Sequence, residues 1–460
     1  MKILFVIRST KHFHYHKSIV RALCSRGYKV CVLFDKRFSK EASLNRVEAY
    51  KKEIASDFAY GWAISTDSLR KRILTYSRDL LSYTRYLKDK DLAKLEVFKE
   101  DWRIHLPIFV RLFLKLPLAK FLVCSAPVVF FLSLMERVFP PDKSAVFDIL
   151  KRSPDLVISS PVDMRGSSVD LEYLKAASKL KISTALQVLS WDNLTVRGLI
   201  HVIPDLFFVW NKYQFQEAIK YHGIPKENIR IVGAPVFDGW FSDLKPSISR
   251  VEFCSRYNLN SSAPIITYLG SSRNIVWNET WLVKSLREAL DKSSDERLKN
   301  AQIIFRPHPG NFKHYKDMDL KKVIVLPKEG ALPDEDSSLQ LFYDTLYNST
   351  VIIGVNTSGS IDAMIAGKPC VALIVPEYQK SHSDTLHFRQ LLDRNILYLI
   401  KNVDEFPSVF LDILNGKDIY KENRQRFIKD FVRPLGLDKI AGEAVANEIG
   451  KFLNNKLTKL

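Results

Sequence analysis

Cysteine and glycine are scarce in this chain of 460 residues, and their scarcity excludes several classes of protein. The five cysteines are scattered and odd in number, and no C-x-x-C pair or cysteine–histidine cluster occurs, which argues against a disulfide framework and a zinc site. Only 17 glycines and 20 prolines are present, without low-complexity segments or internal repeats. We therefore expect an ordered globular protein with reduced thiols.

Long apolar runs are also missing. The uncharged segment from Phe121 to Met135 is shorter than the ~20 residues that a membrane-spanning helix needs, and Pro127 interrupts it. The opening segment Met1–Arg8 has too short an apolar core for a signal peptide. We expect a cytoplasmic protein, either free or peripheral on the inner face of the cytoplasmic membrane.

The segment from Val351 to Val375 carries the strongest pattern in the sequence. A buried strand over 351–355 leads into the polar turn 356–360, then a helix over 361–366 and a second strand over 370–375. Such a unit presents backbone N–H groups and two serine hydroxyls at a helix N-terminus, which favours an anion such as phosphate. Asp362 would suit a ribose hydroxyl beside it. A plain capped helix is the alternative interpretation.

A second polar strand exit lies nearby. Arg306-Pro-His-Pro follows the apolar strand 301–305, and its two prolines stiffen the exit. Arg306 offers a bidentate fork to phosphate, and His308 can donate to an oxyanion. A turn with a surface arginine and histidine is the alternative. Because the serine-rich turn comes one strand–helix unit later, we prefer an anion site.

Together these motifs resemble the nucleotide-binding half of GT-B glycosyltransferases. The branch most similar holds CDP-glycerol glycerophosphotransferases and bacterial capsule or lipopolysaccharide sugar transferases, and the resemblance covers roughly residues 260 to 375. Two departures are Asp362, where that branch has glutamate, and Asn356, where it has an acidic residue. The resemblance implies donor contacts from three strand exits: Ser271, Ser272 and Arg273; Arg306 and His308; and Asn356, Thr357, Ser358, Gly359, Ser360 and Asp362.

The N-terminal half also begins as a nucleotide-type fold, with a strand over 2–7, a helix over 16–26 and a strand over 30–34. The intervening turn lacks G-x-G-x-x-G and is therefore no dinucleotide fingerprint. In GT-B proteins the matching loop faces the acceptor, which implies acceptor contacts from Arg8 and His12. His14 is a candidate base because imidazole titrates near neutrality. A solvated surface loop is the alternative.

Two further polar turns follow strands, at 159–166 and at 190–195. An aromatic ring beside a carboxylate and an amide is typical of sugar recognition, so Trp191 and Asn193 are candidate acceptor ligands. Asp192 is the first candidate for the general base on the acceptor hydroxyl, and Asp163 is the second. Aspartate and asparagine also simply favour turns.

Residues 60–145 lack the alternation of strands and helices. The segment is first basic, around Arg70-Lys-Arg72, and then apolar. One interpretation is a helical insertion that lies on a membrane face, with its basic residues against anionic headgroups. The other is a buried helical hairpin.

We predict a GT-B α/β fold in which two doubly wound, Rossmann-like domains face a cleft. The expected boundaries are 1–245 for the acceptor domain with its insertion, 246–430 for the donor domain and 431–460 for a crossover helix. The expected activity is metal-independent and cofactor-free sugar transfer from a nucleotide-activated donor to a glycan or lipid-linked acceptor. A CDP-polyol phosphotransferase, a nucleotide-sugar epimerase and a non-catalytic scaffold are the alternatives.

The formal net charge of +18 allows nucleic acid, anionic lipid or phosphorylated substrates as partners. No recognised nucleic-acid module occurs, and the basic residues are not interleaved with aromatic residues on a predicted sheet face. We therefore expect a nucleotide-activated sugar and an anionic membrane surface as partners, and no nucleic acid.

Overall fold

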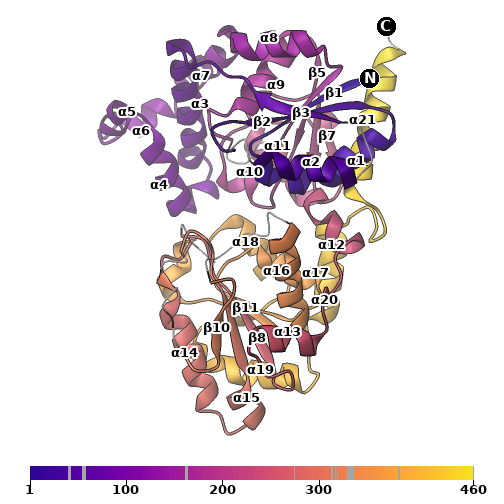
Figure 1. Ribbon diagram of the computed structural model, residues 1–460. Helices are drawn as coiled ribbons and strands as arrows, with labels where there is room; N and C mark the ends of the chain where they lie inside the picture. The colour runs from indigo at the N-terminus through magenta and orange to yellow at the C-terminus, as the bar shows by residue number, and fades with distance from the viewer. Residues whose placement is uncertain are drawn as a thin grey trace. The chain divides into compact units, whose positions relative to one another are not determined.

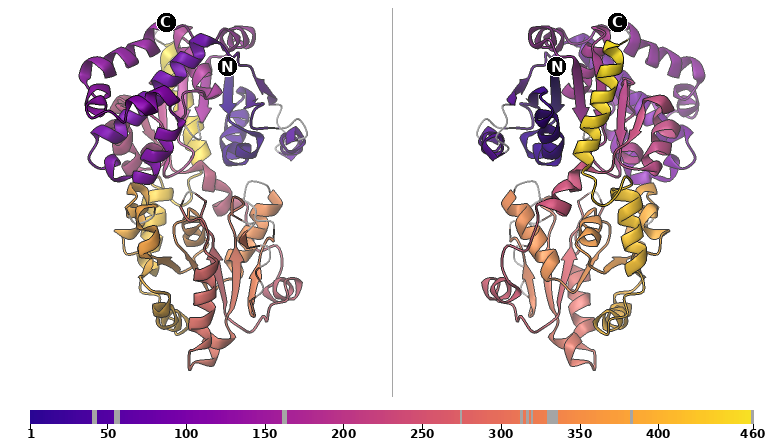
Figure 2. Two further views of the ribbon diagram at one scale, coloured as in Figure 1. Left: turned by 90° about the vertical axis from the view of Figure 1, so that its left-hand side faces the viewer. Right: turned by 90° about the vertical axis from the view of Figure 1, so that its right-hand side faces the viewer.

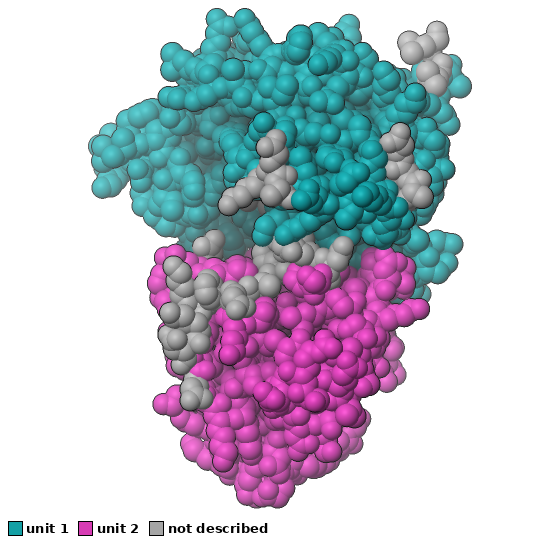
Figure 3. Space-filling model, in the orientation of Figure 1, with its two compact units in different colours: residues 1–238, 429–460 teal, residues 239–428 magenta. Residues whose placement is uncertain are grey.

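The computed structural model describes residues 1–39, 43–53, 58–160, 164–273, 275–311, 314–315, 318, 320–328, 336–381 and 384–458. The chain forms two compact units, which Figure 3 distinguishes by colour. Unit 1 contains Met1–Asp238 together with Lys429–Leu460, and unit 2 contains Gly239–Ile428. Unit 2 is therefore inserted into the sequence of unit 1.

Unit 1 is built on a seven-stranded parallel sheet in the order β3-β2-β1-β4-β5-β6-β7 (Figure 1). Its strands are nearly continuous apolar runs, as expected for a parallel sheet that helices cover on both faces. The bounds are β1 Lys2–Ile7, β2 Lys29–Asp35, β3 Ala59–Ala63, β4 Leu156–Ser160, β5 Ser183–Gln187, β6 Leu206–Val209 and β7 Ile229–Ile231.

The helices beside this sheet include one from the end of the chain. The bounds are η1 Thr10–His16, α1 Lys17–Ser25, α2 Leu44–Glu53, α9 Val169–Lys179, α10 Asn193–Val196, α11 Lys212–His222 and α21 Ala441–Leu457. Helix α21 packs against α1 (Figure 2), and a Cβ at Gly442 would lie 2.5 Å from the carbonyl carbon of Ser18. Only glycine permits that approach.

The start of α21 is held by Asp238. Its carboxylate accepts hydrogen bonds from the backbone N–H groups of Ala441 and Gly442, at 2.9 and 2.8 Å. The same carboxylate forms an ion pair with Arg433 at 2.6 Å. Because all these groups are buried, the returning segment is an integral part of unit 1.

The predicted helical insertion is present, but it begins later than the sequence suggested. Residues from Tyr60 onward first complete strand β3, in which Tyr60 pairs with Val32. The insertion then follows as α3 Leu69–Lys88, η3 Leu92–Lys94, α4 Glu96–His105, α5 Ile108–Phe113, α6 Ala119–Val123, α7 Ala126–Val138 and α8 Lys143–Arg152. Helix α3 contains ten buried residues, whereas α5 and α7 contain none, so the segment is buried on α3 and exposed on α5 and α7.

A buried charge network fixes the insertion to the rest of unit 1. Arg78 on α3 donates to both carboxylate oxygens of Glu136 on α7, at 2.6 and 2.9 Å, and it also pairs with Glu172 on α9. Lys175 lies 3.2 Å from Glu136. Removing one member of such a network would leave an uncompensated buried charge, so the network fixes α7 relative to α3 and α9.

Unit 2 has a six-stranded parallel sheet in the order β10-β9-β8-β11-β12-β13. The strands are β8 Ile265–Leu269, β9 Gln302–Arg306, β10 Val323–Val325, β11 Val351–Gly354, β12 Cys370–Leu373 and β13 Tyr398–Ile400. The helices are α12 Asp238–Ser242, α13 Arg250–Arg256, α14 Thr280–Asp291, α15 Glu296–Asn300, α16 Asp336–Asn348, α17 Gly359–Ile365, α18 Leu386–Leu392, α19 Phe406–Leu414 and α20 Lys421–Phe427. Across the described segments of both units, no helix is long and apolar enough to cross a membrane.

Candidate functional site

The order of strands in unit 2 locates a ligand crevice. From β8 the chain passes to β9 and β10 on one side and then to β11, β12 and β13 on the other. Such a reversal opens a crevice at the carboxyl ends of the two strands where it occurs, here β8 and β11. The predicted donor residues follow these two strands and the neighbouring strand β9.

The three strand exits approach one another closely. The backbone N–H of Gly270 donates to the carbonyl of Arg306 at 2.9 Å, and the N–H of Asn356 donates to Ser271 Oγ at 3.4 Å. A Cβ at Gly270 would lie 3.2 Å from the Arg306 carbonyl oxygen, and one at Gly354 only 2.8 Å from the carbonyl oxygen of Leu269. The structure thus brings Ser271, Arg306 and Asn356 together, as the sequence predicted.

Arg306 carries the most unusual charge in unit 2. Only 5% of the residue is exposed, and its guanidinium lies 4.7 Å from the centroid of the Phe342 ring on α16. Neither terminal guanidinium nitrogen has a hydrogen-bond partner among the described residues. Burial lowers the pKa of Arg306 to about 10, so the group remains charged at neutral pH. An unpaired buried cation is costly, and an anionic ligand would remove that cost.

His308 is half-buried beside this cation. Its Nδ1 accepts a hydrogen bond from the backbone N–H of Gly310 at 3.1 Å. The proton of the neutral ring therefore lies on Nε2, which becomes a donor. Burial lowers the pKa of His308, so the neutral ring is favoured at neutral pH.

Three backbone N–H groups of the turn after β11 form hydrogen bonds within the turn, which differs from the expectation. The N–H of Gly359 donates to Thr357 Oγ1 at 3.1 Å, that of Ser360 to the Thr357 carbonyl at 3.2 Å, and that of Ile361 to the Ser358 carbonyl at 2.9 Å. The sequence predicted free N–H groups here, whereas these three are satisfied locally. Helix α17 is also short, with seven residues. The positive charge at this crevice therefore comes mainly from Arg306.

Asp362 lies in the first turn of α17 and is half-buried. Burial raises the pKa of its carboxyl group to about 7. A carboxyl group that titrates near neutrality can both accept a hydrogen bond and donate one, which suits a sugar hydroxyl.

Ser272 and Arg273 complete the β8 exit. The carbonyl of Ser272 accepts from the N–H groups of Ile275 and Val276, at 2.9 and 3.0 Å. Arg273 is exposed, and its guanidinium lies 4.0 Å from the centroid of the Trp277 ring. The residue is thus a surface cation stacked on an aromatic ring.

Sequence analysis missed Glu279, which shapes the β8 exit. This fully buried carboxylate accepts hydrogen bonds from the backbone N–H of Ser271 at 2.7 Å, from Ser271 Oγ at 3.0 Å and from the Tyr268 hydroxyl at 3.2 Å. Burial raises its pKa to about 7. Asn311 adds a second brace, because its Nδ2 donates to the carbonyls of Ser271 and Val276, at 3.1 and 2.8 Å.

In unit 1 the histidine-bearing turn after β1 is the 3-10 helix η1. Ser9 Oγ lies 3.2 Å from His12 Nδ1, and the rings of His12 and His14 lie 6.2 and 5.5 Å from the Tyr15 ring, centroid to centroid. The guanidinium of Arg8 lies 4.0 Å from the centroid of the Phe38 ring. Contacts within unit 1 therefore already order these three candidates.

The turn after β5 holds the other candidates. The Asp192 carboxylate is half-buried and has no hydrogen-bond or ion-pair partner within the described part of the chain. Trp191 is only 4% exposed, and Asn193 is buried, with its Oδ1 accepting from the N–H of Ser190 at 2.8 Å. The Asn193 amide therefore braces the turn, and little of Trp191 is exposed in this structure. Asp163 lies outside the described residues.

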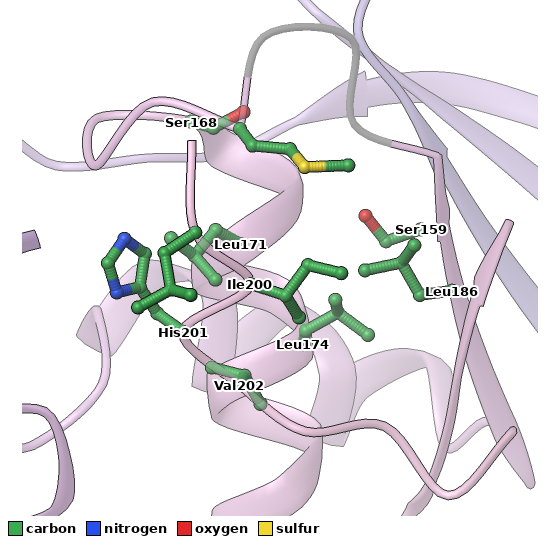
Figure 4. Close-up of a pocket in the computed structure, with 10 residues that line it drawn as sticks. Ser159, Ser168, Leu171, Leu174, Leu186, Ile200, His201 and Val202 are labelled. Carbon is green, nitrogen blue, oxygen red and sulfur yellow. The ribbon is translucent and has the colours of Figure 1, made fainter. Parts of the chain in front are cut away.

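Two of the cavities among the described residues of unit 1 differ strongly in size. The pocket in Figure 4, between β4, β5 and α9, measures about 20 Å³ and is lined mainly by apolar side chains, so it has room for no more than about one water molecule. A larger cavity of about 920 Å³ lies at the carboxyl ends of β2 and β3. Its lining includes Trp62, with Lys36 Nζ 5.7 Å from the ring centroid, and Arg37, paired with Asp35 at 2.7 Å.

No group of three histidine, cysteine, aspartate or glutamate residues in the described segments is arranged to hold a metal ion. No family model matches the sequence, and no curated protein matches it.

Solved structures match the fold over nearly the whole chain. A putative UDP-N-acetylglucosamine 2-epimerase from Listeria monocytogenes has a TM-score of 0.58 at 12% identity, covering 100% of this chain and 97% of its own. The S. aureus MnaA–UDP structure gives 0.57 at 13%, covering 99% and 97%. A glycosyltransferase from Rickettsia africae gives 0.51 at 13%, covering 97% and 99%. The predicted GT-B fold, two Rossmann-like domains with parallel sheets, is thereby confirmed.

Proposed function

We propose that this chain is an enzyme that binds a nucleotide-activated sugar at the carboxyl ends of β8, β9 and β11. The observation that carries the proposal is the buried Arg306 guanidinium, whose terminal nitrogens have no partner among the described residues. A phosphate oxygen pair fits such a fork in a bidentate way. The position of Arg306 beside the strand-order reversal supports the same site, because nucleotides bind at such reversals.

The first candidate reaction is transfer of the sugar to a hydroxyl group of a glycan or lipid-linked acceptor. The bond between the sugar C1 and the phosphate oxygen breaks, a bond from C1 to the acceptor oxygen forms, and the nucleotide leaves with its phosphate. Arg306 and the Nε2–H of His308 stabilise the negative charge that develops on the leaving group. Asp362 binds a ribose hydroxyl. No metal ion or other cofactor is required in this proposal.

Asp192 accepts the proton of the acceptor hydroxyl in this reaction. Its carboxylate has no competing partner among the described residues, which leaves it available as a general base. Asp163 and His14 are the other proposed bases.

Epimerisation of the nucleotide sugar is the second candidate. It is favoured by the structural likeness, since the Listeria and S. aureus matches have TM-scores of 0.58 and 0.57 against 0.51 for the Rickettsia glycosyltransferase. The Listeria protein is described as a putative UDP-N-acetylglucosamine 2-epimerase, and the S. aureus structure contains UDP. An epimerase would need no acceptor.

A thermal-shift screen over UDP-, GDP-, CDP- and CMP-linked donors tests the shared proposal. We expect one class of donor to raise the melting temperature of the wild-type protein and not that of Arg306→Met. If no donor shifts the melting temperature, the chain does not bind a nucleotide-activated sugar of these classes. If the shift is unchanged in Arg306→Met, the donor binds elsewhere.

The reactions are then separated with the donor that binds. Deuterium incorporation into the nucleotide sugar in D₂O without acceptor indicates epimerisation. Glycosyl transfer adds the mass of a sugar to the acceptor. Transfer of a polyol phosphate, the remaining alternative, adds phosphorus to the product.

A further inference from the structure

The insertion of unit 1 exposes large apolar side chains on four consecutive helices, α4 to α7. Seven residues of this segment are between 61% and 80% exposed: Ile108, Phe109, Leu118, Phe121, Phe130, Phe131 and Val138. Figure 1 shows that α5 and α6 project from the rest of unit 1. Folded proteins that remain monomeric in water rarely expose apolar surface on this scale.

The contacts on the inward side of α7 determine which of its residues face outward. Phe130, Leu134 and Val138 recur every four residues and are all exposed. The inward side carries Glu136, which is bound to Arg78, and the Leu132 carbonyl accepts from Ser77 Oγ at 3.1 Å. Because these contacts fix the rotation of the helix, its phenylalanines are held outward.

The charges from Trp102 to Met135 are of one sign, whereas the preceding part of α4 carries Glu96, Glu100 and Asp101. Residues 102–135 contain four arginines or lysines and no aspartate or glutamate, although the chain has 51 acidic residues among 460. Lys115 and Lys120 are exposed between the exposed Leu116, Leu118 and Phe121. Lysines in such a position lay their stems on apolar surface and extend their ammonium groups outward.

We infer that helices α5 to α7 form a membrane-binding surface, which lies in the plane of an anionic lipid bilayer and inserts its exposed phenylalanines and leucines below the headgroups. Alternating cations and apolar residues match an anionic interface. Helix α7 has 13 residues, about 20 Å in length, and therefore lies along the interface rather than across the bilayer. The inference does not depend on the reaction proposed above.

A second copy of the chain fits this surface less well than lipid does. Two copies that meet through the same patch bring their own lysines together, which is repulsive. Lysine is also depleted in protein interfaces. Lipid headgroups, in contrast, supply the opposite charge.

The cations involved differ from those suggested by the sequence. In the basic segment Arg70–Arg72, Lys71 pairs with Asp142 at 3.4 Å and Arg72 with Asp67 at 2.6 Å. These partners reduce the attraction of the segment to a membrane. Lys115 and Lys120 have no ion-pair partner among the described residues and are the cations to test.

Sedimentation with vesicles tests the inference with the full-length protein. We expect the protein to pellet with vesicles of phosphatidylcholine and phosphatidylglycerol at low salt. It should pellet less at about 1 M salt, and only weakly with phosphatidylcholine alone. Lys115→Gln/Lys120→Gln should lower the partition coefficient about 25-fold, about fivefold for each cation. Leu118→Ser/Phe121→Ser should remove the salt-resistant part, with a loss of about tenfold or more per residue.

Matched variants outside the patch provide the controls. Val251→Ser/Ile419→Ser changes two residues of unit 2 that are 68% and 69% exposed, and Lys226→Gln/Lys321→Gln removes two exposed lysines. Both should sediment like the wild type. Wild-type protein that stays in the supernatant with anionic vesicles at low salt overturns the inference. A lipid-free dimer that Leu118→Ser/Phe121→Ser converts to a monomer also overturns it, because the occupant would then be a second copy.

Discussion

The guanidinium of Arg306 lies 4.7 Å from the centroid of the Phe342 ring, and both side chains are buried. The same ring reaches the start of α17, where a Cβ at Gly359 would lie 3.5 Å from Phe342 Cζ. Phe342 therefore packs against the exits of both β9 and β11. The ring face is attractive to the cation but accepts no conventional hydrogen bond, which leaves the terminal N–H groups available for a ligand.

Arg306→Met should weaken binding of the donor by about 10- to 100-fold, because charge-assisted hydrogen bonds to the phosphate contribute about 1.5–3 kcal/mol. In the absence of donor the variant should be as stable as the wild type or more stable, since a buried unpaired charge is removed. Calorimetry and thermal denaturation measure the two effects.

Arg287→Met is the matched control. Arg287 is also buried, but it donates to the carbonyls of Ala301 and Lys299 and pairs with Asp291 at 3.1 Å. We expect this variant to lose stability and to keep its affinity for the donor. If both variants behave alike, Arg306 has a structural role.

Asp192→Asn should lower kcat by about 100- to 10,000-fold, the range that general bases contribute, and leave donor affinity unchanged. Steady-state kinetics and calorimetry separate these effects. Asp205→Asn is a control, because the Asp205 carboxylate accepts from the N–H and the hydroxyl of Thr184 and so supports the fold. If the Asp192→Asn variant keeps full activity, Asp192 is not the general base, and Asp163 and His14 are the residues to test next.

Stability should fall as the pH rises toward neutrality because of Glu279. Its pKa of about 7 in the folded protein exceeds the ordinary value of 4.5, so the folded state holds a proton that the unfolded state has released. Between these two pH values the free energy of unfolding should decrease by about 1.4 kcal/mol per pH unit from this group. Asp362 contributes with the same sign.

Melting temperatures of wild type and Glu279→Gln, measured from pH 4.5 to 8, test that dependence. The wild-type curve should fall more steeply than that of the variant up to about pH 7, and the two should run parallel above it. Parallel curves over the whole range would show that Glu279 does not titrate there.

Gly354→Ala should destabilise unit 2 by about 1–3 kcal/mol, as overpacking usually does. The added Cβ would lie 2.8 Å from the backbone carbonyl oxygen of Leu269, which cannot move aside without disturbing the pairing of β11 with β8. Gly239→Ala, whose nearest neighbour would be 3.7 Å away, should be close to neutral. Denaturant titration compares the two variants.

Glu136→Ala should destabilise unit 1 by about 3–5 kcal/mol, because it leaves Arg78 partly unpaired in a buried position. Glu100→Ala removes an exposed partner of Arg103 and should change stability little. Equal effects in denaturant titrations would mean that the buried network does not hold the insertion.

The sequence was informative where its patterns are local. The apolar runs located β1, β2, β9, β11 and β12 closely, and the prolines after Arg306 marked the exit of β9. Strand β3 was missed because Ala59–Ala63 is short and contains Gly61 instead of a β-branched run. Strands β10 and β13 have three residues each, too few for a periodic signal.

Other features depend on contacts between distant residues. Glu279 reads as an ordinary polar residue at a helix start, and only the folded chain brings Ser271 and Tyr268 to its carboxylate. Trp191 looked like an open sugar-binding ring because its neighbours in sequence are polar, although only 4% of the residue is exposed in the folded chain. The burial of a single residue in a polar turn cannot be predicted from its neighbours in the sequence.

The ion pair of Asp238 with Arg433 has a consequence for engineering the molecule. The chain leaves unit 1 directly after Asp238 and returns at Lys429, and the two residues of the pair are 2.6 Å apart at their charged ends. The nested unit 2 is therefore a cassette with adjacent ends. Joining residue 238 to residue 429 through a short flexible linker should yield the first unit as one continuous chain, and unit 2 should accept exchange for that of another protein with this fold.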